Sequence, residues 1–370
     1  MLLRWLCYTL LLIFLSACQP ADQTESAMTV ESILGARDTA GFNKAVKIRE
    51  FNFPRDHGPH PEFKNEWWYI TGNLTDPQGQ KFGYQITFFR LGMKTGKSPR
   101  KSAWAAEHLW MAHAAVTESG GNKHLSDERF SRDNPGLAGA QWQPFQVWLD
   151  DWQLASPDNE FPWRLVVNSD SFAFELLLEP LKDIILQGEQ GLSRKSETPG
   201  NASYYYSMTR LKTTGELIIE NKTFNVDGLS WLDREWGTSS LDKEQVGWDW
   251  FSLQLNSGED LMYYQLRDKS GQPHPASQGM WVKNNGDSRT IPLSDIRLKP
   301  LDWWRSDKGE RYPVRWEMEY LPEQKKWIIA ALVEDQHMNL SFSYWEGAVG
   351  IFDYTTGKLL GSGYLEMTGY

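Results

Sequence analysis

Cysteine is nearly absent from this 370-residue sequence, which contains only Cys7 and Cys18, both close to the N-terminus. Neither is expected to cross-link the rest of the chain, so no disulfide is predicted within the fold. The folded part must therefore be stabilised by its hydrophobic core.

Motifs of two common enzyme classes are also missing. No Gly-x-Ser-x-Gly elbow surrounds any serine, so a lipase-type serine hydrolase has no support. No glycine-rich phosphate-binding loop is present either. Basic residues are outnumbered, with 38 Lys and Arg against 48 Asp and Glu and a net charge of −10. Such an acidic chain argues against nucleic acid as a partner.

The first residues, MLLRWLCYTLLLIFLSAC, resemble a bacterial lipoprotein signal. Arg4 supplies a positive charge, and the apolar run that follows is too short to cross a bilayer comfortably. The ending Leu-Ser-Ala-Cys predicts a signal peptide at 1–17 and lipidation of Cys18, with an ordinary cleaved signal peptide as the alternative. Gln19 favours the outer membrane over the inner one. We therefore predict a linker at 18–43 and anchoring at the periplasmic face of the outer membrane.

Strand patterns dominate the rest of the chain. Apolar or alternating runs such as KFGYQITFFR and DWFSLQLNSGEDLMYYQLRD are separated by Gly, Asn, Asp or Pro. The helix-like segments 103–108 and 293–296 are too short to form a layer. The predicted fold is all-β, with antiparallel sheets in barrels or sandwiches.

Two hairpin-like segments resemble each other. Trp67 is followed by Leu74 and by Tyr-Gln-Ile at 84–86, and Trp248 is followed by Leu255 and by Tyr-Gln-Leu at 264–266. This repeat favours two similar β-domains over one large sheet. We place these domains at residues 44–235 and 236–370.

Seven segments, taken in order, make the chain similar to the AttH / carotenoid 1,2-hydratase-like family: NEWWYITGNL, GYQITFFR, WMAHAAVTE, SWLDREWGTSSL, GWDWFSLQLNSGE, YWEGAVG and GYLEMTGY. The resemblance implies two tandem lipocalin-like (calycin-type) antiparallel β-barrel domains. It also implies a lipid or isoprenoid-like ligand, which barrels of this kind hold in the mouth or lumen. The implied activity is open between addition of water to a C=C bond and hydrolysis of a lipid.

One segment departs from the family pattern. Where the carotenoid hydratases carry a histidine-containing segment of the type His-Asn-Trp-Gly, this chain has Arg-Glu-Trp-Gly at 234–237. The tryptophan and glycine match and the histidine does not. The resemblance therefore does not carry the role of that histidine, or a carotenoid substrate, over to this chain.

Two acidic residues fall on strand faces that are otherwise apolar. Side chains alternate along a strand, so Glu66 shares a face with Trp68 and Ile70, and Asp249 shares a face with Phe251. Burial would raise the pKa of such an acid, as a general acid at neutral pH requires. Alternatively, each acid lies in water or pairs with an arginine. We expect Glu66 where the apolar lumen meets solvent or the other domain.

The segment SWLDREWG carries two more acids. Alternation places Asp233 and Glu235 on one face of a strand, and Arg234 and Trp236 on the other. The two acids suit an acid–base pair or the activation of a water molecule. Alternatively, Arg234 only joins an ion pair that clamps the two domains. Asp233, Glu235 and Asp249 are therefore the candidate catalytic residues.

The histidines show no clear metal-binding pattern. His57 and His60 lie in a Pro/Gly loop with no evident third ligand, and His108 and His113 point to opposite faces of one strand. No metal and no cofactor are expected. His113 stays a pocket candidate because WMAHAAVTE matches the family.

Together these features predict a membrane-tethered periplasmic lipoprotein that binds a hydrophobic lipid or isoprenoid-like molecule, with hydratase or lipid-directed hydrolase activity left open. The alternative is a non-enzymatic structural partner of a membrane transport or envelope assembly. The residues expected to bind the ligand are Glu66, Trp68, Tyr84, His113, Trp236, Trp250 and Tyr264.

Overall fold

The computed structural model describes residues 39–93, 106–133, 136–238, 241–242 and 244–370. The predicted signal peptide, Cys18 and most of the predicted linker lie outside these residues. The described part contains strands and three short 3-10 helices, but no α-helix. None of its helices is long and apolar enough to cross a membrane. The prediction of an all-β, antiparallel protein is confirmed.

The first sheet has 13 strands, in the order β4-β3-β2-β1-β13-β12-β9-β8-β7-β6-β5, with β10 and β11 paired to β12. The 3-10 helix η1 (Arg55–His57) precedes it. Its strands are β1 (Asn65–Thr75), β2 (Lys81–Gly92), β3 (His108–Glu118), β4 (Lys123–Arg132), β5 (Ala138–Trp142), β6 (Phe145–Leu149), β7 (Trp152–Ser156), β8 (Trp163–Asn168), β9 (Phe172–Pro180), β10 (Ile185–Leu186), β11 (Leu192–Arg194), β12 (Ala202–Ile219) and β13 (Lys222–Gly237).

The second sheet has ten strands, in the order β17-β16-β15-β14-β23-β22-β20-β19-β18, with β21 paired to β22. The 3-10 helices η2 (Leu293–Asp295) and η3 (Leu321–Glu323) connect some of its strands. The strands are β14 (Gln245–Leu255), β15 (Asp260–Asp268), β16 (Gln278–Val282), β17 (Ser288–Pro292), β18 (Ile296–Arg305), β19 (Arg311–Tyr320), β20 (Lys325–Ala331), β21 (His337–Asn339), β22 (Ser343–Asp353) and β23 (Leu359–Met367).

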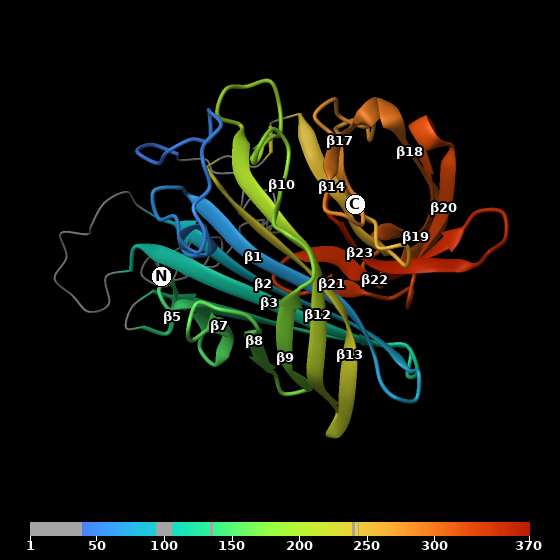
Figure 1. The fold of residues 1–370 in the computed structure, drawn as a ribbon, viewed down its shortest axis with the longest axis horizontal. Coiled ribbons are helices and arrows are strands. Elements are labelled where there is room, and N and C mark those ends of the chain that lie inside the picture. The colour runs from blue at the N-terminus through green and yellow to red at the C-terminus, as the bar shows by residue number, and fades with distance from the viewer. Residues whose placement is uncertain (1–38, 94–105, 134–135, 239–240, 243) are drawn as a thin grey trace, which may run out of the picture.

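The chain changes sheet once, between the end of β13 at Gly237 and the start of β14 at Gln245. The predicted domain boundary at 235/236 falls just before the end of β13. Figure 1 shows the second sheet nearly end-on as a near-closed barrel, beside the more open, strongly curved first sheet. The two domains are therefore lipocalin-like β-structures in tandem, one from each sheet.

Each sheet packs its inward face into a hydrophobic core of its own. The core of the first domain includes Trp68, Ile86 and Leu176. The core of the second includes Phe251 and Trp316. Strand alternation explains this arrangement, because every second side chain of a strand faces the same side of the sheet.

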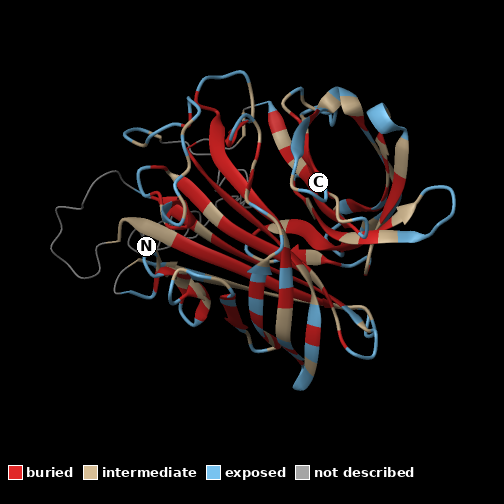
Figure 2. Cartoon of the chain, viewed as in Figure 1, coloured by how far each residue is buried: buried red, intermediate tan, exposed pale blue. Residues whose placement is uncertain are grey.

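The burial pattern shows where the two domains meet. Along β9 burial alternates between consecutive residues, which is typical of a strand with one face in water. Along β2 and β3 burial is nearly continuous, because the second domain covers their outer face. Figure 2 shows this difference as long buried stretches in the central strands and alternating bands on the free ends of β9, β12 and β13.

The two sheets approach each other closely at β2 and β22. A Cβ atom added at Gly83 of β2 would lie 2.5 Å from the methyl carbon of Ala348 in β22, so only glycine fits there. Polar contacts hold the domains together nearby: Asp260 in β15 accepts hydrogen bonds from Lys182 at 2.8 Å and from Arg210 at 2.6 Å. The interface therefore fixes the outer faces of both sheets relative to each other.

Candidate active site between the two domains

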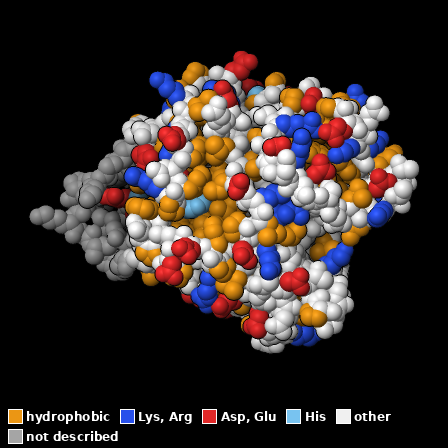
Figure 3. Space-filling model, in the orientation of Figure 1, with side chains coloured by type: hydrophobic (Ala, Val, Ile, Leu, Met, Phe, Trp, Pro, Cys, Tyr) orange, Lys and Arg blue, Asp and Glu red, His pale blue; other side chains and the backbone are white. Residues whose placement is uncertain are grey.

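A cavity of about 100 Å³ lies between the outer faces of the two sheets. The family resemblance implied a ligand in the mouth or lumen of a barrel. The cavity lies elsewhere, because the inward faces of both sheets are filled by the two hydrophobic cores. Figure 3 shows hydrophobic side chains gathered near the middle of one face, among scattered acidic and basic ones. The cavity is lined by Trp67, Tyr69, Thr87, Phe89, Lys195, Tyr205, Asp233, Glu235, Leu241, Trp248, Trp250, Tyr264, Leu266, Phe342, Tyr344, Glu346 and Glu366.

Four of the lining residues are acids, two from each domain. Asp233 and Glu235 lie two positions apart in β13 and face the cavity together, as alternation predicts. Glu346 in β22 and Glu366 in β23 are direct cross-strand partners. Asp233, Glu235 and Glu346 are nearly inaccessible to solvent, and Glu366 is partly buried. The cavity thus places an acid pair of one domain opposite an acid pair of the other.

Asp233 is surrounded by hydrogen-bond donors. Its carboxyl group accepts hydrogen bonds from the hydroxyls of Tyr205 and Ser207, and from the indole of Trp231 at 2.7 Å. Burial raises the pKa of Asp233 to about 7, although these three donors oppose the shift. At neutral pH this side chain is therefore poised between its protonated and ionised forms.

Both acids of the second-domain pair also have raised pKa values. Burial raises the pKa of Glu366 to about 8, against a hydrogen bond from Trp248 and with further help from the charges of Asp233 and Glu235. Burial and then the charge of Glu366 raise the pKa of Glu346 well above its ordinary value. Two carboxyls this close disfavour double ionisation, so the pair holds a proton at neutral pH.

Glu235 has a different environment from the other three acids. Its carboxylate lies 3.1 Å from the ammonium group of Lys195 and accepts a hydrogen bond from Ser203. Burial alone would lower the pKa of Lys195, but the charge of and hydrogen bond to Glu235, together with Tyr264 and the charge of Asp233, outweigh burial and raise it. Lys195 is therefore charged, and Glu235 is its carboxylate partner.

Aromatic rings form most of the remaining wall. Trp250 makes an edge contact with Tyr69 across the domain boundary, with ring centroids 5.1 Å apart. The ammonium group of Lys195 lies over the ring of Tyr264, 4.5 Å from its centroid. Such rings bind apolar surface and can stabilise a positive charge next to their faces.

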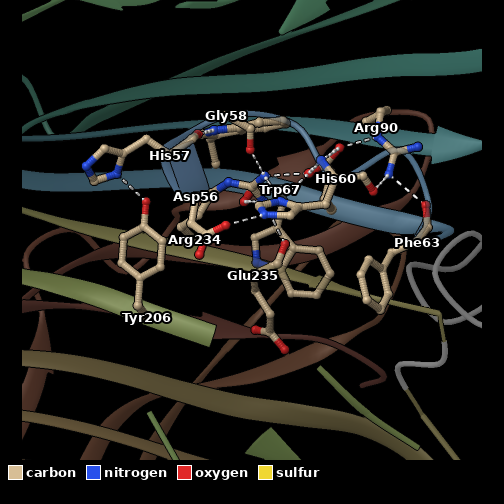
Figure 4. A network of polar contacts seen from close by, with 12 residues as sticks. Asp56, His57, Gly58, His60, Phe63, Trp67, Arg90, Tyr206, Arg234 and Glu235 are labelled. Atoms are coloured by element: carbon tan, nitrogen blue, oxygen red, sulfur yellow. Dashed lines mark hydrogen bonds and ion pairs between the residues drawn. The ribbon is translucent and has the colours of Figure 1, made fainter. Parts of the chain in front are cut away.

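Glu66 lies on the opposite face of β1, in the first domain, and not at the cavity. Its carboxylate is buried and accepts hydrogen bonds from the guanidinium groups of Arg90 and Arg234. Figure 4 shows the network that these arginines form with the loop at 56–63. Burial acts to raise the pKa of Glu66, but the two guanidiniums and the neighbouring His60 together outweigh it and hold the pKa well below its ordinary value. Of the interpretations that the sequence left open for Glu66, pairing with an arginine is therefore the one that the structure supports.

Arg234 does not clamp the two domains, as one interpretation of the sequence proposed. Besides Glu66, its guanidinium donates to the carbonyl oxygens of Gly58 at 2.7 Å and of Trp67 at 3.3 Å, all within the first domain. The ring of Trp68 lies 3.8 Å from the centre of the guanidinium. Arg234 thus ties β13 to the loop that precedes β1.

The other predicted site residues fall into two groups. Trp250 and Tyr264 line the cavity with Asp233 and Glu235. Trp68, Tyr84 and Trp236 belong to the core of the first domain, because alternation turns them inward. Trp236 stacks on His60 there, with centroids 3.8 Å apart.

Asp249 is buried on the inward face of the second domain. It accepts a hydrogen bond from Tyr370 at 2.8 Å and lies 3.3 Å from Arg267. Burial raises the pKa of Asp249, although the charge of Arg267 opposes this. His113 lies behind the cavity wall, with its Nδ1 atom 2.8 Å from the hydroxyl of Tyr344. No described group of three or more His, Cys, Asp and Glu is arranged to hold a metal ion.

Glu346, Glu366 and Lys195 were not identified from the sequence. Glu346 and Glu366 stand in YWEG and YLEM, where an acid alternates with large apolar residues. This is the signal that singled out Glu66 and Asp249, so it could have found these acids too. Lys195 lies after β11 in a segment without a recognisable pattern, and only the fold brings it to Glu235.

The raised pKa of Asp233 predicts that the difference in stability between wild type and Asp233→Asn depends on pH. Well below its ordinary pKa of 3.8, Asp233 is protonated in both the folded and unfolded chain. As pH rises, only the unfolded chain loses the proton, which lowers the free energy of unfolding by about 1.4 kcal/mol per pH unit until the pH reaches about 7. The free energy of unfolding of Asp233→Asn, relative to that of wild type, should therefore rise with pH across this window and then level off.

Urea unfolding of both proteins at several pH values measures this difference. Asp227→Asn, at an exposed position of the same strand, is the control. If the free energies of unfolding of Asp233→Asn and wild type change with pH in parallel between about pH 4 and pH 7, the raised pKa of Asp233 is contradicted.

Fold and site define a class of protein: a two-domain, lipocalin-like β-protein with an aromatic cavity and opposed acid pairs between its domains. The sequence pattern of the AttH-like family matches residues 44–370. The chain belongs to this family. Among curated proteins, none is similar enough in sequence to count as a match.

Two solved structures are similar to the chain over most of its length. An AttH protein from Nitrosomonas europaea is 33% identical, with a TM-score of 0.78 over 89% of this chain and 100% of that one. Kievitone hydratase from Nectria haematococca is 16% identical, with a TM-score of 0.65 over 89% of this chain and 96% of that one. The second likeness shows that a hydratase has this fold.

Proposed function

We propose that this protein binds a hydrophobic, unsaturated small molecule in the interdomain cavity and adds water to one of its C=C bonds. The observation that carries the proposal is the pair of proton-holding carboxyls, Glu346 and Glu366, facing Asp233 and Glu235 across an aromatic cavity. A lipid or isoprenoid-like molecule matches the walls. The fold shared with kievitone hydratase supports the reaction class.

The proposed reaction begins on the second domain. A protonated carboxyl of the Glu346–Glu366 pair gives its proton to one alkene carbon, where the π electrons form the new C–H bond. The cation left on the other carbon lies against aromatic faces such as that of Trp250. A water molecule forms the C–O bond, and a carboxylate of the Asp233–Glu235 side takes its proton. Glu366, with a pKa of about 8, and Asp233, with a pKa of about 7, thus have separate roles as acid and base.

Lipid hydrolysis is the less favoured chemistry at this site. A serine nucleophile would require a histidine base beside it. The described residues that line the cavity include neither serine nor histidine. Opposed carboxyls instead suit proton addition on one side and water activation on the other.

The N-terminal sequence supports a location for this chemistry. We propose that the lipid on Cys18 anchors the protein at the periplasmic face of the outer membrane, where hydrophobic substrates are close at hand. Palmitate labelling of the protein in its own host, with Cys18→Ala as the comparison, tests the anchor. Label retained by the variant would contradict it.

Ligand binding can be tested with a fluorescent polyene fatty acid as the probe. Trp250→Ala removes one aromatic wall, so binding should weaken about tenfold or more, or about 1.4 kcal/mol. Trp142→Ala, at an exposed tryptophan of β5, should leave binding unchanged. Native mass spectrometry of the protein expressed from Gln19 onward would then identify a co-purifying ligand. Equal binding by the wild type and Trp250→Ala would contradict the proposed site.

A further inference from the structure

The proposed reaction leaves the two sides of the cavity unequally protonated. The acid pair of the second domain loses a proton in each turnover, and the Asp233–Glu235 side gains one. Asp233, Glu235 and Glu346 are almost completely shielded from solvent, whereas Glu366 is partly exposed. Reprotonation of Glu346 itself in a repeated reaction therefore needs a route through the protein.

His113 lies where such a route would have to cross the domain boundary. It stands in the middle of β3 and is completely buried. Its Nδ1 atom is 2.8 Å from the hydroxyl oxygen of Tyr344 in β22 of the second domain. Tyr344 lines the cavity on the same face of β22 as Glu346, and its hydroxyl interacts with the carboxyl of Glu346. A side chain of the first domain is thus linked to an acid of the second.

The other nitrogen of His113 points toward the protein surface. Its Nε2 atom lies 3.7 Å from Oε2 of Glu128, its cross-strand partner in β4. The carboxylate of Glu128 is oriented by Ser341, whose backbone N–H and hydroxyl donate to Oε1 at 2.9 and 2.8 Å. The Glu128 side chain is 23% exposed, so it connects this chain of groups with solvent.

Unsatisfied atoms lie at the step between His113 and Glu128 and at the end of the series, on Oε1 of Glu346. His113 Nε2 and Glu128 Oε2 are both buried, and neither has a hydrogen-bond partner among the described residues. A purely structural histidine would be expected to have both ring nitrogens satisfied. Burial lowers the pKa of His113 to about 3, so the ring is neutral and can accept a proton at one nitrogen while donating from the other.

We propose that Glu128, His113 and Tyr344 form a proton relay between solvent and Glu346, an inference that rests on the proposed function. A proton taken up at Glu128 passes to Nε2 of His113, while the proton on Nδ1 moves to the oxygen of Tyr344. Tyr344 in turn gives its own proton to the carboxylate of Glu346. Each of the three groups gains one proton and loses one, which leaves His113 protonated on Nε2. A reorientation of the imidazole that restores a proton facing Tyr344 completes the cycle before the next delivery, whereas hydrogen–deuterium exchange needs only the forward and reverse transfers.

The relay can be tested without a substrate, by infrared spectroscopy of the purified protein. A protonated carboxyl has a C=O stretching band that shifts when its proton is replaced by deuterium. Glu346→Gln identifies the band of Glu346 by removing it. After rapid transfer into heavy water, the shift of this band should be on the order of tenfold or more slower in His113→Gln, Tyr344→Phe and Glu128→Gln than in wild type.

His124→Gln is the matched control, because His124 is another histidine near the same interface, partly buried and bonded to Thr117 and Met338. It should exchange at the wild-type rate. Glu128 is partly exposed, so Glu128→Gln is expected to fold even if His113→Gln does not. Wild-type exchange in Glu128→Gln and in any folded His113→Gln would overturn the relay and leave the proposed function standing. If Glu346→Gln removes no band, Glu346 is not protonated and the relay fails, while the proposed function keeps Glu366 as its proton donor.

Discussion

Replacing Glu66 by glutamine is expected to destabilise the protein by about 3–5 kcal/mol, the usual cost of breaking a buried ion pair from one side. The substitution leaves the guanidiniums of Arg90 and Arg234 buried without the carboxylate that both of them contact. The carbonyl oxygens that also bind these arginines cannot neutralise two positive charges. The free energy of unfolding, from denaturant titration, measures the loss.

The pH dependence of this loss tests its cause. The pKa of Glu66 lies well below 4.5 in the folded protein, so its stabilisation is complete above about pH 5 and is lost as the pH falls through the folded pKa. The gap between wild type and Glu66→Gln should therefore narrow in acid. Glu175→Gln, which breaks an exposed pair with Arg164, should change stability by no more than about 1 kcal/mol. An equally small effect at Glu66 would contradict the buried network.

Loss of an acid from the cavity is expected to slow the proposed hydration by about 100- to 10,000-fold, the usual contribution of a positioned acid or base. Glu366→Gln removes a proton donor, and Asp233→Asn removes a carboxylate from the opposite side. Both side chains keep nearly the same size, so ligand binding should change much less than the rate. Turnover of the ligand that co-purifies with the protein is the measurement.

Asp249→Asn is the informative control for these variants. Asp249 is also a buried acid with a raised pKa, but it lies on the inward face of the second sheet. If position in the cavity matters, this variant should keep its activity. A loss as large as that of Glu366→Gln would show that the catalytic acids lie elsewhere, as the sequence prediction of Asp249 allowed.

Strand alternation made much of the fold predictable. The faces assigned to Asp233, Glu235 and Arg234 agree with the structure, because an error of one residue would reverse every side chain of β13. The repeat of the two hairpins was less informative about faces. From Trp67 to Tyr84 the chain is one residue longer than from Trp248 to Tyr264. Trp67, Trp248 and Tyr264 therefore face the cavity, while Tyr84 faces the core.

The site itself could not be assembled from the sequence. Its acids lie more than one hundred residues apart, at 233–235 and 346–366, and only the packing of the two outer faces brings them together. Sequence patterns identify which face of a strand is apolar, but not whether that face meets a core or another domain. The expectation of a ligand in a barrel lumen came from the family resemblance, and the strand patterns could not correct it.

The central claim is that the opposed acids of the interdomain cavity add water to an unsaturated hydrophobic molecule. Its most direct test is to incubate the protein and its co-purified ligand in water labelled with the heavy oxygen isotope, and to analyse the extract by mass spectrometry. The account predicts a product heavier than the ligand by one labelled water, formed by wild type and not by Glu366→Gln. A ligand recovered without label from wild type would contradict it.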